Sequence, residues 1–206
     1  KKLGGTCVNV GCVPKKIMWY GAQIAESFHH YGPDYGFTSS DVQFDFAKLR
    51  QNREAYIDRA RSSYDGSFKR NGVDLIEGRA HFVDSNTVSV NGELIRAKHI
   101  VIATGARPSI PTIPGAELGG NSDDVFAWEQ LPESVAILGA GYIAVELAGV
   151  LHTLGVKTDL FVRRDRPLST FDSYIVEGLV NEMEKTGLPL HTHKVPVKLE
   201  ETEQGI

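Results

Sequence analysis

The spacing of apolar side chains predicts two long helices in the first third of the chain. Residues 17–30 contain no proline and predict the first helix. Residues 45–70 predict the second, because apolar residues recur there near the helical period: Phe46, Leu49, Tyr56, Ile57 and Tyr64. Gly66 should weaken this helix, and Asn71-Gly72 should end it.

The pattern then changes to the short apolar runs that are typical of strands. Four runs separated by turn residues predict strands at residues 73–76, 80–83, 87–90 and 93–95. Asn91-Gly92 is a strong hairpin signal. Residues 99–103 are mostly apolar and predict a buried parallel strand that runs into the turn Thr104-Gly105.

A proline- and glycine-rich connector follows at residues 107–122 and marks a domain boundary. Beyond it, an apolar strand at 134–138, a helix to about residue 154 and a strand at 157–162 predict a βαβ unit. The chain is therefore expected to be an α/β protein, divided into residues 1–107, 108–122 and 123–206.

Length, composition and charge narrow the possible functions. The 206 residues suffice for one large or two modest domains, and 41% hydrophobic with 23% charged residues is ordinary for a soluble globular protein. The net charge of −4 gives no reason to expect nucleic acid or an anionic membrane as a partner. No apolar run approaches the ~20 residues of a membrane span. Two cysteines suggest a reducing compartment, which we expect to be the cytoplasm.

Cys7 and Cys12 precede the first predicted helix. Residues five apart in a regular helix have Cα atoms roughly 8.7 Å apart, whereas a disulfide requires about 4.4–6.8 Å. If the two cysteines bond, the backbone must depart from a helix, and Gly11 and Pro14 would permit this. Two ordinary thiols or half of a metal site are the alternatives, but no second cysteine pair exists to complete a zinc site.

The residues around the cysteines are suited to redox chemistry. A helix N-terminus and the ammonium groups of Lys15 and Lys16 favour a thiolate. Gly4-Gly5-Thr6 brings bare backbone amides and a hydroxyl to the same terminus, which is a suitable seat for a phosphate.

A dinucleotide fingerprint follows the strand at 134–138. Gly139-Ala140-Gly141-Tyr142-Ile143-Ala144 has the G-x-G-x-x-A form between a strand and a helix. The first glycine allows the tight turn, the second lets a pyrophosphate approach, and Ala144 lets the helix pack closely on the strand. We therefore predict dinucleotide binding at this turn.

The next strand bears on the choice of cofactor. An NAD site places an acid at the end of this strand, but Asp159 lies in its middle. Arg163 and Arg164 occupy the strand end, and Arg166 lies just beyond. Such cations suit a 2′-phosphate and predict NADPH; a solvated basic turn is the alternative.

The segment Gly-Gly-Thr-Cys-Val-Asn-Val-Gly-Cys-Val-Pro-Lys-Lys resembles the redox-active disulfide segment of the flavoprotein disulfide reductases. Its double lysine is more similar to the branch that reduces glutathione disulfide than to the dihydrolipoamide or mercuric branches. The resemblance implies that Cys7 attacks the substrate and that Cys12 lies against the flavin. It also implies two Rossmann-like nucleotide-binding domains, for FAD and NADPH, both incomplete in this chain.

The resemblance spans essentially the whole chain and assigns residues to both cofactors. Those implied near FAD are Gly5, Thr6, Cys7, Lys15, Ala80 (through its backbone), Thr104 and Gly105. Those implied for NADPH are Gly139, Ala140, Gly141, Tyr142, Ile143, Glu146, Arg163, Arg164 and Ser169. Tyr64 is implied at the mouth of the glutathione site.

Two of these residues lie four apart on one helix face. The resemblance implies that Tyr142 covers the flavin until nicotinamide displaces it, and that Glu146 pairs with Lys15. From the residues alone, the simpler interpretation of Tyr142 is a surface tyrosine, and that of Glu146 is a solvated glutamate. For Thr104-Gly105 the simpler interpretation is a plain turn. For Tyr64 it is an aromatic residue on an amphipathic helix.

Two further positions stay open. Ser169 stands where the resemblance leads us to expect a further arginine, and Arg166 could take that role. His191 and His193 alternate on a strand, but no third ligand is evident, so no metal is predicted.

The expected function is NADPH-dependent reduction of glutathione disulfide through FAD and the Cys7–Cys12 disulfide, in a homodimer. Both ends of the chain look cut, and the phosphate-binding motif of the FAD domain is missing, so we expect the isolated chain to be inactive and to bind FAD weakly. One alternative is a related reductase that acts on trypanothione, mercuric ion or dihydrolipoamide. Another is a fragment that binds NADPH without turnover.

Overall fold

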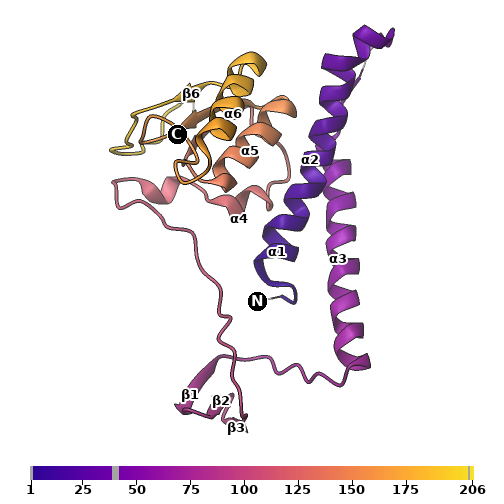
Figure 1. Ribbon diagram of the computed structural model, residues 1–206, viewed down its shortest axis with the longest axis vertical. Coiled ribbons are helices and arrows are strands. Elements are labelled where there is room, and N and C mark those ends of the chain that lie inside the picture. The colour runs from indigo at the N-terminus through magenta and orange to yellow at the C-terminus, as the bar shows by residue number, and fades with distance from the viewer. Residues whose placement is uncertain (1, 39–41, 204) are drawn as a thin grey trace.

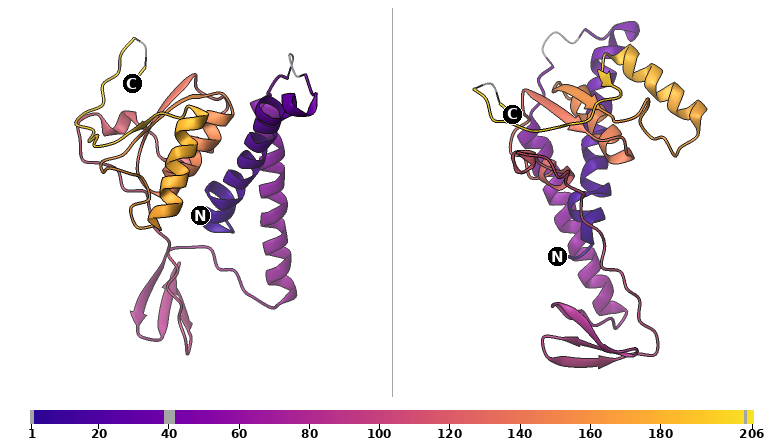
Figure 2. Two further views of the ribbon diagram at one scale, coloured as in Figure 1. Left: turned by 45° about the horizontal axis from the view of Figure 1, so that its top comes forward. Right: turned by 90° about the vertical axis from the view of Figure 1, so that its left-hand side faces the viewer.

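The computed structural model describes residues 2–38, 42–203 and 205–206. It has three parts: a pair of long helices side by side, a small three-stranded sheet, and an α/β unit toward the C-terminus (Figure 1). The α/β unit lies against the helix pair, whereas the small sheet projects from the rest in both views of Figure 2.

The helix pair begins with two consecutive helices. α1 (Gly5–Val10) and α2 (Cys12–Glu26) are separated by a break at Gly11. α2 starts earlier than the sequence predicted because Pro14 falls in its first turn, where a backbone N–H has no helical partner to lose. Short π-helical and 3₁₀ turns follow, at Ser27–Tyr31 and Gly32–Tyr35.

The second long helix, α3 (Phe46–Arg70), confirms the predicted one. It begins where the side chain of Asp45 accepts a hydrogen bond from the backbone N–H of Lys48 at 3.1 Å. Gly66 does not interrupt it, and it ends at Asn71 as expected.

The small antiparallel sheet confirms three of the predicted strands, namely β1 (Ala80–Asp84), β2 (Thr87–Val90) and β3 (Glu93–Arg96). Asn91 and Gly92 have φ angles of 52° and 89°. Positive values at both positions are those of a type I′ hairpin turn, so this turn has the geometry that its dipeptide predicts.

The strands predicted at residues 73–76 and 99–103 are wrong. Val101 and Ile102 are 87% and 70% exposed on an extended segment instead of buried in a sheet. A parallel strand needs neighbours for its backbone groups, and no strand in the described part of the chain pairs with either segment. Apolar composition alone therefore does not make a strand, because the segment also needs a neighbouring strand to pair with.

The C-terminal part is the expected parallel unit, with strands and helices in alternation. Its elements are β4 (Ser134–Leu138), α5 (Tyr142–Thr153), β5 (Lys157–Phe161), α6 (Ser173–Thr186) and β6 (Leu190–His191). β5 lies in the middle and pairs in parallel with β4 and β6. The predicted α/β class is confirmed. A 3₁₀ turn and a short helix precede the unit, η3 (Ala116–Leu118) and α4 (Ser122–Val125).

One hydrophobic core joins the helix pair to the α/β unit. Leu147, Val150 and Leu151 of α5 pack there against residues of α2, α3 and the segment after α4: Met18, Ala22, Phe46 and Phe126. The opposite side of α5 packs on the sheet through Val145 and Ala148. The first and last parts of the chain are therefore not independent bodies.

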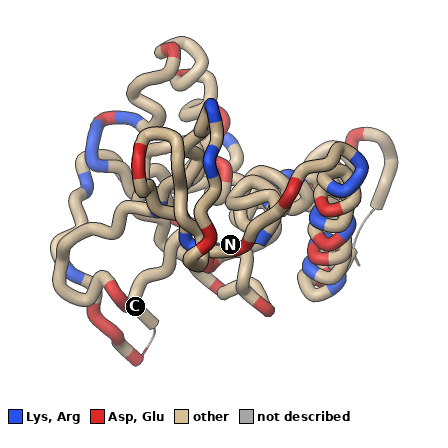
Figure 3. The backbone as a smooth tube through the Cα atoms, turned by 90° about the horizontal axis from the view of Figure 1, so that it is seen from below, with Lys and Arg blue, Asp and Glu red and all other residues tan. Residues whose placement is uncertain are grey.

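The surface carries mixed charge. Positively and negatively charged residues are interspersed along the chain (Figure 3), and in α3 the ion pairs Asp58–Arg61 and Asp65–Lys69 follow the helical spacing. Within the described residues, no helix is both long and apolar enough to cross a membrane. In that same part of the chain, no cluster of three or more His, Cys, Asp and Glu side chains could hold a metal ion.

A buried arginine connects the two halves of the shared core. The Arg53 side chain is 0% exposed, donates to the backbone oxygen of Phe126 at 2.7 Å and lies 3.5 Å from the sulfur of Met18. Glu54 accepts from the same guanidinium at 2.8 Å. Because a buried charge is costly without partners, these contacts hold α3 to α2 and to the segment after α4.

We predict that Arg53→Met lowers the free energy of unfolding by about 2–3 kcal/mol, because it leaves the carbonyl of Phe126 buried without a donor. Arg50→Met is the matched control: Arg50 also bridges from α3, to Glu129, but through a pair with 36% and 81% of the side chains exposed. This control should change stability by less than about 0.5 kcal/mol. Urea denaturation of the chain measures both, and equal effects would contradict the role of Arg53.

Candidate functional site

The turn between β4 and α5 has the shape that the fingerprint predicts. A Cβ atom added to Gly139 would lie 3.0 Å from the Cβ of Ala144, so the strand and the helix approach closely there. A Cβ added to Gly141 would meet nothing within 4 Å. Gly141 also precedes α5 without a side-chain cap, so the first N–H groups of a twelve-residue helix face open space.

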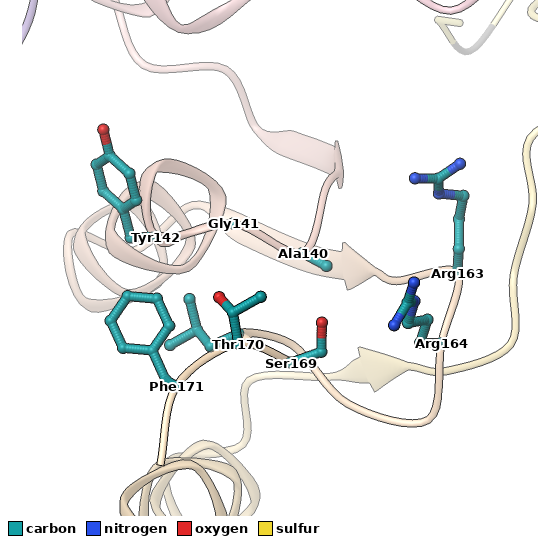
Figure 4. A pocket seen from close by; sticks show the side chains of 9 residues that line it. Ala140, Gly141, Tyr142, Arg163, Arg164, Ser169, Thr170 and Phe171 are labelled. Atoms are coloured by element: carbon teal, nitrogen blue, oxygen red, sulfur yellow. The ribbon is translucent and has the colours of Figure 1, made fainter. Parts of the chain in front are cut away.

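A cavity of about 540 Å³ opens beside this turn. Figure 4 shows Arg163 and Arg164 on one side of it and Tyr142 on another, with the loop after β5 between them. The cavity is lined by Ala140, Gly141, Tyr142, Arg163, Arg164, Leu168, Ser169, Thr170 and Phe171. Open space, helix N–H groups and two guanidinium groups fit the phosphates of a dinucleotide.

The loop that closes this cavity was only partly predicted. Ser169 lines it, whereas Arg166, which could take the role of the expected arginine, is not among the described lining residues. Thr170 and Phe171 were not predicted. The backbone N–H of Leu168 donates to the oxygen of Ala140 at 2.7 Å and brings this loop to the fingerprint turn, a contact between residues 28 positions apart that no local pattern shows.

Asp159 is engaged elsewhere. Its carboxylate lies 2.6 Å from Nε2 of His191 on β6, on the face of β5 opposite to the buried side chains of Thr158 and Leu160. Its carboxylate is therefore engaged with a side chain of the neighbouring strand.

The cysteine segment departs from a helix between the two cysteines, as the spacing required. Gly11 has φ −152° and ψ −118°, outside the helical region. A Cβ atom at this position would lie 2.8 Å from the backbone oxygen of Thr6, so only glycine fits the break. Both cysteines are exposed free thiols, which is the reduced form of the expected pair.

The thiol of Cys7 does not have the lowered pKa that the lysines predicted. A hydrogen bond with the Cys12 side chain is the main cause that raises the pKa of Cys7 above its ordinary value of 9.0, while Lys15 lowers it to a smaller extent. Lys15 is held by a carboxylate, and the ammonium of Lys16 lies 3.5 Å from the ring centre of Trp19. Both ammonium groups thus have partners other than the sulfur.

An ion pair connects the cysteine helix to the fingerprint helix. Nζ of Lys15 lies 2.5 Å from Oε1 of Glu146, across 131 positions of sequence. The side chains are only 24% and 39% exposed. The pairing implied by the resemblance is therefore present, and it links α2 to α5.

The remaining predicted residues are not brought together. Ala80, Thr104 and Gly105 are exposed, on or after the small sheet, which lies away from α1 in Figures 1 and 2. Tyr64 is 45% exposed on α3, with its ring centre 6.4 Å from that of Phe68. Gly5 and Thr6 are exposed at the start of α1, and Ile143 is exposed at the start of α5. The residues thus fit a dinucleotide at α5, and only in part a flavin.

We predict that the alkylation rate of Cys7 rises with pH around a midpoint above 9.0, because its raised pKa keeps the thiol protonated below that pH. Cys12→Ala removes the main cause of the shift and should move the midpoint down toward the ordinary value. Iodoacetamide labelling followed by peptide mass spectrometry measures this. A midpoint that stays unchanged in Cys12→Ala would contradict the assigned cause.

Comparison with known proteins agrees with the geometry of these sites. The sequence profile described as pyridine nucleotide-disulphide oxidoreductase matches residues 2–206. Glutathione reductase of Schizosaccharomyces pombe is 42% identical over 205 residues, which cover 96% of this chain and 44% of that protein.

Solved structures show the same fold. The HOCl-induced flavoprotein disulfide reductase RclA from Escherichia coli superposes with a TM-score of 0.81 at 23% identity, over 98% of this chain and 45% of the other. A Cu(II) complex of RclA gives a TM-score of 0.80 at 23% identity, over 98% and 44%. The chain spans less than half of the length of each of these relatives. With the fingerprint turn, the dithiol segment and the profile match in agreement, the chain belongs to the pyridine nucleotide-disulphide oxidoreductase family.

Proposed function

We propose that this chain carries the dithiol and dinucleotide sites of an NADPH-dependent flavoprotein that reduces glutathione disulfide. The observation that carries the proposal is the Lys15–Glu146 ion pair. It connects the helix that begins at Cys12 to the helix that begins at the fingerprint turn. The ion pair therefore holds the dithiol helix against the helix that would bind the dinucleotide.

The choice of NADPH rests on the cavity beside Gly141. Arg163 and Arg164 line it, and Asp159, the acid within β5, is paired with His191. A 2′-phosphate is nearly dianionic at neutral pH, and each charge-assisted bond to it contributes about 1.5–3 kcal/mol. Ser169 adds a neutral donor at the same cavity.

The two cysteines carry the exchange with the substrate. Cys7, as a thiolate, attacks one sulfur of glutathione disulfide, which forms a mixed disulfide and releases one glutathione thiolate. Cys12 then attacks the sulfur of Cys7, which forms the Cys7–Cys12 disulfide and releases the second glutathione. The two protons lost by the cysteines are taken up by the two leaving thiolates. When bound, FAD would supply the two-electron transfer between the nicotinamide and this cysteine pair.

The rest of the assignment follows from the same proposal. Residues 1–107 belong to the flavin-binding part, and residues 123–206 form the dinucleotide-binding part. Residues 108–122 are the connector between them. Gly5, Thr6, Ala80, Thr104 and Gly105 would approach the flavin in the whole polypeptide, which we propose to be a cytoplasmic homodimer. The 42% identity to a glutathione reductase supports glutathione disulfide as the substrate.

We predict that the reduced chain is oxidised by glutathione disulfide to the intramolecular Cys7–Cys12 disulfide. Cys12→Ser should stop at a mixed disulfide with glutathione on Cys7, because the second attack is lost. Cys7→Ser should react roughly tenfold more slowly, because Cys12 is then left to attack a substrate from the flavin side. Peptide mass spectrometry identifies each product, and glutathione attached mainly to Cys12 in the wild-type chain would reverse the assignment.

We predict that Arg163→Met weakens the binding of NADP⁺ about tenfold or more and changes the binding of NAD⁺ by less than about twofold, since ~1.4 kcal/mol is tenfold. Arg166→Met is the matched control: it removes the same charge from the same loop, but Arg166 does not belong to the described lining of the cavity. Isothermal titration of each dinucleotide measures the effect. Equal losses for NADP⁺ and NAD⁺ would show that the arginines are a solvated turn.

A further inference from the structure

The chain that follows β6 runs beside the arginine turn and holds it by its backbone. The N–H of Val162 donates to the oxygen of His191 at 2.9 Å, and the N–H of Lys194 donates back to the oxygen of Val162 at 3.0 Å. The N–H of His193 donates to the oxygen of Arg164 at 3.0 Å. Backbone hydrogen bonds thus continue beyond the ends of β5 and β6 as far as the second arginine.

An uncommon backbone conformation makes this possible. His193 has φ 55°, in the left-handed region that residues other than glycine rarely adopt. In an extended strand successive N–H groups point to opposite sides, so two consecutive donors cannot both reach the same neighbour. The left-handed residue reverses the direction between His193 and Lys194, and both N–H groups then bond to the extension of β5. Such strain persists where the surroundings hold it.

The side chain that anchors this segment is His191. Its Nε2 lies 2.6 Å from Oδ1 of Asp159, and its ring stacks on Phe161 with centres 4.4 Å apart and an angle of 12° between the planes. Asp159 and Phe161 belong to the same face of β5, whose next residues are Val162 and Arg163. The pair is partly exposed, with 30% of the Asp159 side chain and 36% of the His191 side chain accessible. Such a pair adds little to the free energy of unfolding, so its main effect is to hold His191 in position.

We propose that the segment 191–194, anchored by the Asp159–His191 hydrogen bond, is a specificity-determining element for the 2′-phosphate of the dinucleotide. It acts through Arg163 and Arg164: its three backbone hydrogen bonds fix the turn from which both guanidinium groups reach the cavity. The proposal rests on the NADPH assignment above. His191 and Asp159 are positioning residues and do not themselves touch the phosphate.

The direction in which the affinity for NADP⁺ relative to NAD⁺ changes distinguishes a positioning role of Asp159 from a direct effect of its charge. Asp159 is an anion near a site for an anion, so on charge alone its removal strengthens the binding of NADP⁺ relative to NAD⁺. If Asp159 holds His191 and the arginine turn, its removal has the opposite effect. Asp159→Leu therefore discriminates between the two explanations, and Asp159→Asn, which removes the charge but keeps an oxygen that can accept from Nε2, provides a conservative rescue.

The experiment is titration of NADP⁺ and NAD⁺ onto the whole chain and its variants, with the ratio of the two affinities as the readout. Asp159→Leu and His191→Phe, which keeps the stack on Phe161, should each lower the ratio about tenfold, as a displaced binding group does. Asp159→Asn should keep the ratio within about twofold of the wild type. The control is His152→Phe, which removes the 2.9 Å contact of another histidine with the oxygen of Thr186, at the opposite end of α5; it should lower stability and leave the ratio unchanged.

The outcomes keep the two proposals apart. A wild-type chain without preference for NADP⁺ overturns the cofactor assignment and this inference with it. A wild-type preference that Asp159→Leu and His191→Phe leave unchanged or increase overturns this inference alone. A ratio that also falls in His152→Phe shows a general loss of fold and overturns it as well. If His191→Phe does not fold, the Asp159→Leu and Asp159→Asn pair decides, since neither changes the segment 191–194.

Discussion

The structure depends on a helix that is buried on two opposite sides. α5 packs Val145 and Ala148 on the parallel sheet, and Leu147, Val150 and Leu151 on the helix pair. A helix with apolar residues all round has no stable place at a surface. The dinucleotide turn at its start and the dithiol helix beside it are therefore held at a fixed separation by packing, without any contribution from a ligand.

This arrangement explains why one charge is tolerated within an apolar helix. Glu146 is the only acidic or basic residue of α5 apart from His152 in the last turn, and it lies on the side that faces α2. A carboxylate in such surroundings needs a cation, and Lys15 provides one three positions after Cys12. With Lys15 engaged by Glu146, the hydrogen bond from Cys12 is the main influence on the Cys7 thiol and raises its pKa.

Features that depend on neighbours in sequence could be predicted, and those that depend on distant neighbours could not. The fingerprint turn, the Asn91-Gly92 hairpin and the Asp45 cap each follow from a few adjacent residues. The segment 99–103 has the composition of a buried strand, but its state is decided by strands that must lie beside it. Arg53 resembles any arginine of a charged helix until Phe126, 73 positions away, supplies its acceptor. For the same reason, Arg163 and Arg164 could be predicted beside the fingerprint turn, whereas their backbone contacts with residues 191–194 could not. The Lys15–Glu146 pair was expected only through resemblance, because 131 positions separate its members.

The shared core also determines the order in which parts of the chain can pack during synthesis. Strand pairing within the α/β unit, as between Ser134 and Lys157, joins segments that are made soon after one another. The helix pair is made before α5, and the cover that α5 gives to Met18, Ala22 and Phe46 follows about a hundred residues later, which takes roughly 5–20 s at ordinary rates of translation. During that interval the dithiol helix presents an apolar face beside two reactive sulfurs. The apolar face and the two thiols are thus accessible together before the parallel unit closes over the helix pair.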